Sequence, residues 1–340
     1  STRGPTRAFG TREPRQLAVE ETRPAPGAGR GDDRPDAAPH VAPDLVQADT
    51  EVALVSLNQW QLAYRRYRRH RLAMIGLAIF SFMLLVGILG PEVRPYSFVN
   101  IPGATKPGGD PPGAEHIFGT TQEGRDVFEL VVNGARISLI VGLATMLMSG
   151  IIGTIVGALA GYFGGLIDNV LMRIVDVLFA IPFLFVILVM TRIFGQGDVL
   201  SLILVFGLLS WPFIARLTRA SFLSLRETDF VDAARAVGVS NVRIAFRHVL
   251  PNAMGPIIVA MTLLMASAIV TEAFVSFLNF GIRETEVSWG NALSSAQNAL
   301  RFGNWWWSFF PGMAIALTVL AINFMGDGLR DALDPRSREP

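Results

Sequence analysis

Long uncharged runs of apolar residues alternate with short charged segments over most of the chain. The first run, Leu72 to Leu89, has 18 residues and as a helix is long enough to cross a bilayer once. The second, Ile137 to Ile167, exceeds one bilayer thickness, so its helix is expected to tilt or to end near Gly161 to Gly165. Four more runs follow at about residues 173–193, 199–215, 253–278 and 305–325. The pattern predicts an all-α polytopic membrane protein with six transmembrane helices.

Two features inside these runs predict how the helices bend and pack. Pro182 removes one backbone hydrogen bond from the third helix and is expected to kink it, as in helices that line a pathway. Glycines recur every four residues in the second helix, at Gly153, Gly157, Gly161 and Gly165. Such a face lets backbones approach closely, which favours helix association in lipid. It fits packing inside one subunit and a seam between two subunits equally well.

The basic residues are distributed unevenly among the predicted loops. Fifteen of the 29 lie near run ends on one side of the membrane, seven lie on the other side, and seven lie in the first 48 residues. Cytoplasmic loops are enriched in Lys and Arg. The side with fifteen is therefore expected to be the cytoplasm, which places both termini there.

The segments around the runs are then assigned by composition. Residues 1–50 are rich in Pro, Gly and charge, which predicts a disordered cytoplasmic tail. Residues 51–71 are aromatic and basic, which predicts an interfacial helix under the anionic leaflet. The other assignments are an uncleaved first transmembrane helix and extracytoplasmic loop at 72–135, a core domain at 136–326 with a cytoplasmic loop at 216–252, an aromatic belt at Trp305, Trp306 and Trp307, and a cytoplasmic tail at 327–340.

Composition narrows the chemistry that this chain can carry. It is 51% hydrophobic and 17% charged, with a mean hydropathy of +0.42, as expected for a membrane protein. With no cysteine it has no disulfide, thiolate metal site or cysteine nucleophile. Its only lysine, Lys106, lies in GATKPG, which does not fit a phosphate-binding P-loop. A P-loop ATPase site is therefore not expected here.

A charged, helix-forming segment from Asp232 to Asn252, DAARAVGVSNVRIAFRHVLPN, separates two of the apolar runs. Gly238 is expected to break a first short helix, and Ser240 to cap a second one that ends at Leu250-Pro251. A force on such a loop would pass directly into the membrane helices on either side. A DNA-binding helix-turn-helix also fits the pattern, but the bilayer at both ends leaves little room for a duplex. The segment is interpreted as a coupling element, with no nucleic acid as partner.

The same residues resemble the EAA motif of ABC importer permeases, which has the form E-A-A-x3-G-x9-I-x-L-P. The matching positions are Asp232, Ala233, Ala234, Gly238, Ile244, His248, Leu250, Pro251 and Asn252. Longer stretches resemble the C-type permease subunits of the dipeptide, oligopeptide and nickel importers. These stretches are YRRYRRHRLAMIGL, GRDVFELVVNGARISLIVGL, RHVLPNAMGPIIV, SFLNFGI with SWGNALS, and GDGLRDALDPR.

The departures from the family pattern are modest. Asp232 replaces the usual Glu, and Thr121 stands where an Asp is common. RETEV replaces a Pro-rich stretch before Ser288. The last two lie outside the predicted membrane region, so they affect the expected substrate and not the expected class.

The resemblance implies a type I ABC importer fold in a bacterial cell membrane and a transport subunit that is not itself an enzyme. It implies a homologous second permease, two cytoplasmic ATPase subunits, an extracytoplasmic substrate-binding protein and membrane lipid as partners. This chain would bind no cofactor, and ATP and Mg²⁺ would be used by the ATPases. The expected substrate is a di- or oligopeptide, with nickel or another small solute as the alternative.

A few polar side chains within the spans have two interpretations each. Glu272 is a functional candidate as an intramembrane carboxylate, and a structural contact fits equally well. Asp176 is expected to pair with Arg173. Asn323 is expected to bond between helices. His248 is expected to pack in the loop, and no metal site is predicted.

Two other classes of membrane protein fit the sequence less well. An ion-driven secondary transporter predicts paired broken helices in two related halves, and no such repeat is visible in the sequence. A membrane enzyme needs clustered His, Asp, Glu or Ser in its spans, which are nearly bare.

Overall fold

The computed structural model describes residues 59–95, 109–193, 198–282, 286–297, 299 and 303–334, without the side chains of Thr191 and Arg192. All of them belong to one compact unit that begins at Ser56. The predicted tail at 1–50 and the start of the predicted interfacial helix lie outside the described residues. The interfacial helix appears as α1, Gln59–Arg69.

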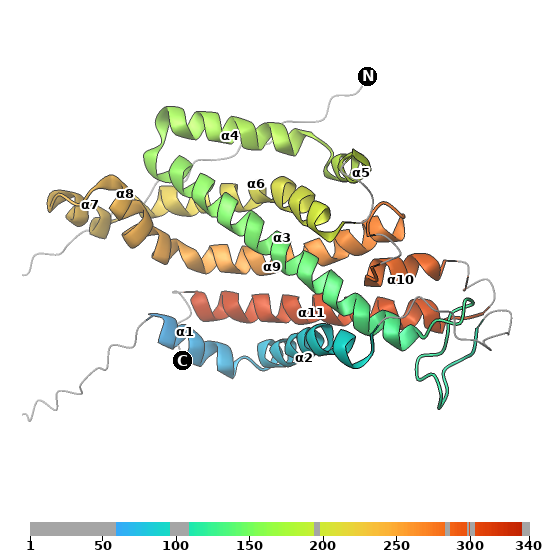
Figure 1. The fold of residues 1–340 in the computed structure, drawn as a ribbon. Coiled ribbons are helices and arrows are strands. Elements are labelled where there is room, and N and C mark those ends of the chain that lie inside the picture. The colour runs from blue at the N-terminus through green and yellow to red at the C-terminus, as the bar shows by residue number, and fades with distance from the viewer. Residues whose placement is uncertain are drawn as a thin grey trace, which may run out of the picture. The chain divides into compact units, whose positions relative to one another are not determined.

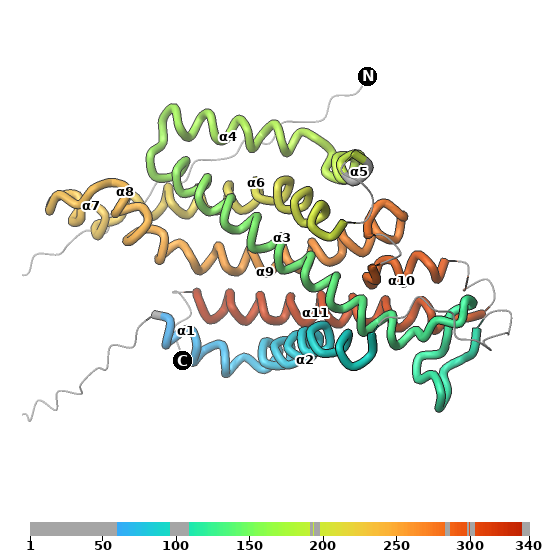
Figure 2. Tube along the Cα trace, in the orientation of Figure 1, coloured from blue at the N-terminus to red at the C-terminus, as the bar shows by residue number. Residues whose placement is uncertain are grey.

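Membrane-spanning helices account for most of the described chain (Figures 1 and 2). Five helices are long and apolar enough to cross a bilayer, and a bent pair gives a sixth span if it counts as one. The five are α2 (Arg71–Val93), α3 (Val127–Phe163), α6 (Val199–Leu225), a helix over Asn241–Phe277 that includes α9 (Leu250–Phe277), and α11 (Trp306–Leu333). The pair is α4 (Gly165–Ala180) and α5 (Phe183–Ile193). The all-helical prediction is confirmed.

Helix packing centres on α3, which contacts α2, α6 and α9, while α2 and α11 lie side by side (Figure 1). Three glycines of the predicted stripe lie against α6. A Cβ at Gly153, Gly157 or Gly161 would come within 2.4 to 2.6 Å of an α6 atom. Gly165 has nothing within 4 Å of its Cβ position. The stripe therefore serves packing inside one subunit over its first three positions.

The third span is broken where a kink was predicted. α4 and α5 meet at an angle of 81° around Ile181 and Pro182. Proline lacks the backbone donor and also restricts the residue before it, and Ile181 has an extended conformation. The span also begins earlier than expected, at Gly165 instead of Arg173, because Gly164 ends α3 with a φ of 66°.

Two helices continue beyond the predicted apolar runs. α3 begins at Val127, because the Asp126 carboxylate accepts a capping hydrogen bond of 2.7 Å from the Phe128 N–H. The polar segment before Ile137, which the sequence assigns to the extracytoplasmic loop, is thus the first part of α3. α11 continues to Leu333, so residues 327–333 of the predicted tail are helical.

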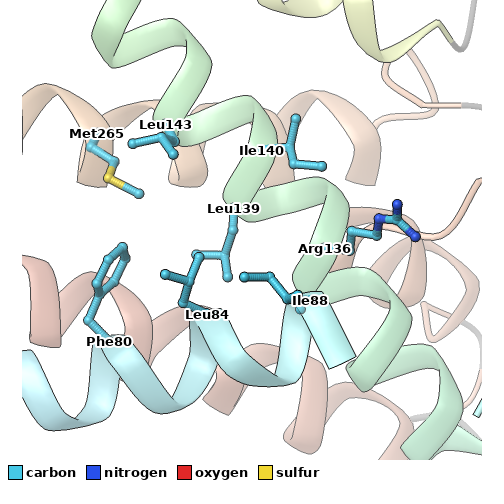
Figure 3. Close-up of a pocket in the computed structure, with 9 residues that line it drawn as sticks. Phe80, Leu84, Ile88, Arg136, Leu139, Ile140, Leu143 and Met265 are labelled. Atoms are coloured by element: carbon cyan, nitrogen blue, oxygen red, sulfur yellow. The ribbon is translucent and has the colours of Figure 1, made fainter. Parts of the chain in front are cut away.

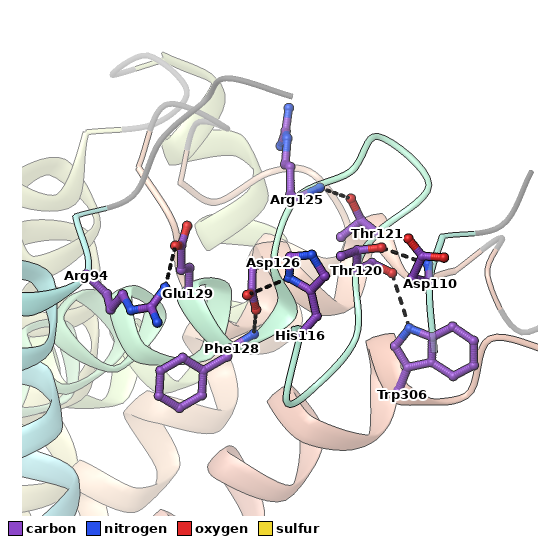
Figure 4. Close-up of polar contacts among 10 residues, drawn as sticks. All are labelled: Arg94, Asp110, His116, Thr120, Thr121, Arg125, Asp126, Phe128, Glu129 and Trp306. Carbon is purple, nitrogen blue, oxygen red and sulfur yellow. Dashed lines mark hydrogen bonds and ion pairs between the residues drawn. The ribbon is translucent and has the colours of Figure 1, made fainter. Parts of the chain in front are cut away.

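The segment 109–126 is held against the start of α11 (Figure 4). The Thr120 carbonyl accepts hydrogen bonds from the indole N–H groups of Trp306, at 3.2 Å, and Trp307. Both indoles are buried, whereas the neighbouring Trp305 is exposed. The predicted aromatic belt is therefore wrong for Trp306 and Trp307, whose N–H groups fix a loop instead.

Candidate functional site

The α6–α9 loop, defined here as residues 226–249, begins with the short helix α7, Asp229–Ala236. Asp229 and Asp232 lie in its first turn, where acidic residues are favoured by the helix dipole. Val231 is fully buried and Ala234 packs against the same core, while Asp232 and Ala233 are exposed. α7 therefore buries one face and presents the other outward.

The turn after α7 depends on Gly238. Its φ is 79°, in the region that side chains with a Cβ disfavour. This conformation lets the N–H of Gly238 donate to Arg235 O at 3.0 Å and the N–H of Val239 to Ala234 O at 3.1 Å. These bonds satisfy the carbonyls at the end of α7. Nothing lies within 4 Å of the Gly238 Cβ position, so the turn faces open space.

The second half of the loop runs without a break into the membrane. α8 (Asn241–Arg243) is followed by the π-helix η1 (Ile244–Val249), which passes directly into α9 at Leu250. The predicted helix end at Leu250-Pro251 is therefore wrong. Pro251 is the second residue of α9 and has no N–H to donate to the preceding turn, so it removes one hydrogen bond there without ending the helix. Ser240 occupies the N-cap position of α8, but its hydroxyl makes no capping bond.

The motif positions divide into outward-facing and inward-facing sets. Asp232, Ala233, Gly238, Pro251 and Asn252 are exposed, Ala234, His248 and Leu250 are partly buried, and Ile244 is buried. Ile244, Ala234 and Leu250 of the inward set belong to a core with residues of α6 and α9, including Ile214 and Ile257. The Asn252 amide donates to the His248 carbonyl at 2.7 Å. No group of potential metal ligands includes His248 among the residues that the structure describes.

Apolar side chains are exposed along the outer surface of this loop. Val237 is 78% exposed and Val242 is 59% exposed, and Phe230 and Phe246 are also accessible. Such residues on a protruding loop fit contact with another protein.

Two hydrogen bonds attach the loop to the end of α3. The Tyr162 hydroxyl donates to Asn241 Oδ1 at 3.2 Å, and Arg226 donates to the Gly161 carbonyl at 3.4 Å. The loop is therefore attached to three spans: α6 and α9 through the chain, and α3 through these contacts. The contact of Tyr162 is not predictable from the sequence, because no local pattern pairs residues 79 positions apart.

Ion pairs near the same end join α4 to α6. Asp176 binds Arg216 at 2.6 Å, so the predicted pair with Arg173 is wrong. Asp168 binds Arg219 through two bonds, of 2.5 and 2.6 Å. The sequence spacing does indicate these two ion pairs. Arg216 and Arg219 share one helix face, and so do Asp168 and Asp176.

The candidates inside the spans differ in their surroundings. Glu272 is fully buried and accepts hydrogen bonds from Ser138 and Ser276. Pro182 lies at the break between α4 and α5. Asn323 is half-buried on α11, and its side chain has no hydrogen bond to the described residues, so the predicted interhelical bond is not seen.

An apolar pocket of about 270 Å³ lies away from the loop, between α2, α3 and α9 (Figure 3). Phe80, Leu84, Leu139 and Met265 are among its lining residues, and Arg136 lies at one end. Its residues are unrelated to the motif positions.

The fold and the α6–α9 loop define a transport permease. The similarity of the chain to known protein families then gives its family. Residues 153–339 match the binding-protein-dependent transport system inner membrane component family, to which the chain belongs. Residues 58–107 match the N-terminal TM domain of oligopeptide transport permease C. The chain is thus a multi-pass inner-membrane protein of the ABC importer permease class.

Particular relatives extend over most of the chain. The dipeptide transport system permease protein DppC of Bacillus subtilis is 41% identical over 283 residues, covering 83% of this chain and 88% of the relative. The oligopeptide transport system permease protein OppC of the same organism is 38% identical, covering 85% and 93%. An inward-facing structure of the MetNI methionine ABC transporter matches 60% of this chain and 96% of its own, with a TM-score of 0.51 and 22% identity. That structure supports the fold.

Proposed function

We propose that this chain is one permease subunit of an ATP-driven importer of di- or oligopeptides, and that its α6–α9 loop is the contact for the ATPase subunits. The observation that carries the proposal is mechanical: η1 passes into α9 with no intervening turn. A displacement of the loop would therefore move a membrane-spanning helix directly.

The exposed surface of the loop suits a protein partner. Val237, Val242 and Phe246 present apolar area that a docked ATPase would cover. Asp232 pairs with Arg235 at 3.0 Å on an exposed surface, where charge can guide docking. The only lysine of the chain lies outside any P-loop pattern, so ATP and Mg²⁺ would bind to the partner subunits.

The other partners follow from the family. A homologous second permease would supply the other half of the pathway, two ATPases would dock in the cytoplasm, and an extracytoplasmic binding protein would deliver substrate. Both termini and the α6–α9 loop would then be cytoplasmic, in accord with the arginine distribution. The peptide substrate is supported by the names of the two Bacillus subtilis relatives.

Substitution of Gly238 tests the coupling role. Gly238→Leu adds a side chain at the exposed turn and forces leucine into a positive φ. We expect peptide uptake to fall about tenfold or more, equivalent to about 1.4 kcal/mol, while the assembled complex still hydrolyses ATP. The measurement is uptake and hydrolysis by the complete complex in proteoliposomes.

Gly303→Leu is the matched control. Gly303 has a φ of 78° and nothing within 4 Å of its Cβ position, but lies at the end of the helix bundle opposite the loop. The two variants therefore carry the same backbone strain, and only the first changes the proposed contact. Equal uptake by the two variants would contradict a coupling role for the loop.

A further inference from the structure

A buried carboxylate joins three elements at the end of the bundle opposite the α6–α9 loop. Glu272 lies on α9, roughly 33 Å from Leu250 at 1.5 Å per residue. Its side chain is fully buried. Ser138 of α3 donates to it at 2.9 Å and Ser276 of α9 at 2.8 Å. Ser288, the N-cap of the short helix α10 (Trp289–Ser295), also hydrogen-bonds it.

The directions of the surrounding hydrogen bonds show that the Glu272 carboxylate accepts from three serine hydroxyls. Each serine oxygen also accepts from a backbone N–H: Ser138 from Trp289 at 3.3 Å, Ser276 from Ile282 at 3.4 Å, and Ser288 from Asn291 at 3.2 Å. Because the backbone N–H groups are the donors there, each hydroxyl is free to turn its single hydrogen toward Glu272. The three hydroxyls therefore connect the backbone N–H groups of Ile282, Trp289 and Asn291 to one carboxylate.

Close packing limits independent movement of α10. A Cβ at Gly290 would lie 2.6 Å from the Ala273 carbonyl of α9. A Cβ at Gly134 of α3 would lie 2.8 Å from the Trp289 ring. The Trp289 indole N–H donates to the Val131 carbonyl at 2.8 Å. α10 is thus seated on both α3 and α9 around the Glu272 side chain.

We propose that Glu272 is a positioning residue that fixes α10 to α9, so that displacement of η1 is carried along α9 to α10 at the opposite end of the bundle. The inference rests on the proposed function of the α6–α9 loop. One continuous helix has the loop at its beginning and the carboxylate near its end. Loop movement and the surface that faces the delivered substrate are thereby linked within one subunit.

The functional test uses Glu272→Gln in the complete complex with both permeases, both ATPases and the binding protein. Gln keeps the size of the side chain, but its amide group donates where the carboxylate accepts. A serine hydrogen is then left without an acceptor in a buried site. We expect basal ATP hydrolysis to persist, and binding-protein-stimulated hydrolysis and uptake to fall about tenfold. A purely structural role would lower basal and stimulated hydrolysis together.

A distance measurement tests the mechanical link. The chain has no cysteine, so Ser295→Cys on α10 and Val270→Cys on α9 give a specific pair of spin-label sites. Both positions are exposed. We expect one narrow distance distribution with and without ATP, and a broadened distribution once Glu272→Gln is added. Glu129→Gln is the control, since Glu129 is a carboxylate of α3 at the same end, paired with Arg94 at 3.7 Å (Figure 4).

The outcomes separate this inference from the proposed function. Unchanged stimulated hydrolysis and an unchanged distance distribution in Glu272→Gln would overturn the inference. If that variant does not assemble, Ser288→Ala, which keeps two of the three donors, decides by the same readouts. If Gly238→Leu lowers uptake and the Glu272 variant does not, the inference fails alone. If neither lowers uptake, the coupling role of the loop fails as well.

Discussion

At the scale of single residues, two ion pairs join α4 to α6 and differ in kind. Arg219 holds both oxygens of Asp168, and the Asp168 side chain is only 15% exposed. Arg216 makes one bond to Asp176, both side chains are about half exposed, and its guanidinium lies 4.2 Å from the centre of the Phe179 ring. Paired, directional bonds in a shielded position stabilise more than a single exposed bond.

Arginine-to-lysine substitutions are expected to separate the two pairs. Arg219→Lys keeps the charge but loses the two-bond geometry, which we expect to lower stability by about 1 kcal/mol. Arg216→Lys is the control, because lysine can keep a single bond and a cation–π contact. The measurement is the thermal unfolding midpoint in detergent. Equal shifts of the unfolding midpoint in the two variants would show that the two-bond geometry at Asp168 adds no stability over a single bond.

Sequence spacing predicted the loop residues but not their contacts. The positions from Asp232 to Asn252 are local, so one pattern of small, turn-forming and apolar residues identifies them. The bonds of Tyr162 to Asn241 and of Ser138 to Glu272 join residues 79 and 134 positions apart. Such contacts depend on how the spans cross, which no local pattern specifies.

At the scale of elements, the close packing of α3 against α6 depends on glycines, which have no side chain. Gly157→Ala would place its Cβ 2.4 Å from the Ala215 carbonyl oxygen, a backbone atom that cannot move alone. We expect a loss of about 1–3 kcal/mol from overpacking. Gly255→Ala in α9 is the control, because its Cβ would have no neighbour closer than 3.5 Å. Thermal unfolding of the two purified variants, compared directly, checks the prediction. An equal loss in both would mean that glycine is needed for backbone reasons at both sites.

The apolar runs predict which segments form membrane helices, but they do not predict where those helices begin and end. Apolar runs report the bilayer-facing length, whereas α3 and α11 continue with polar residues beyond it, to Val127 and Leu333. Pro182 predicts a disturbance of the third helix. Whether a proline bends or breaks a helix depends on the packing around it, and here the helices meet at 81°.

At the scale of the whole molecule, the orientation in the membrane is open to direct test. Val237→Cys and Ile117→Cys create single cysteines at exposed positions in a chain that has none. We expect a membrane-impermeant maleimide to label position 117 in spheroplasts and position 237 only after permeabilisation. The reverse pattern would invert the topology and remove the loop from the side of the ATPases.

The π-helix η1 has a consequence for how this chain can vary. A π turn holds about one residue more than an α turn, so loss of one residue from Ile244–Val249 would restore α geometry. Because the π turn holds the extra residue within one turn, the segments before and after it would keep nearly the same relative rotation around the axis of α9. The chain can therefore lose one residue here without turning the exposed surface of the loop away from its partner. An insertion or deletion in the α-helical part that follows would instead rotate everything before it by about 100°, the angle of one helical residue.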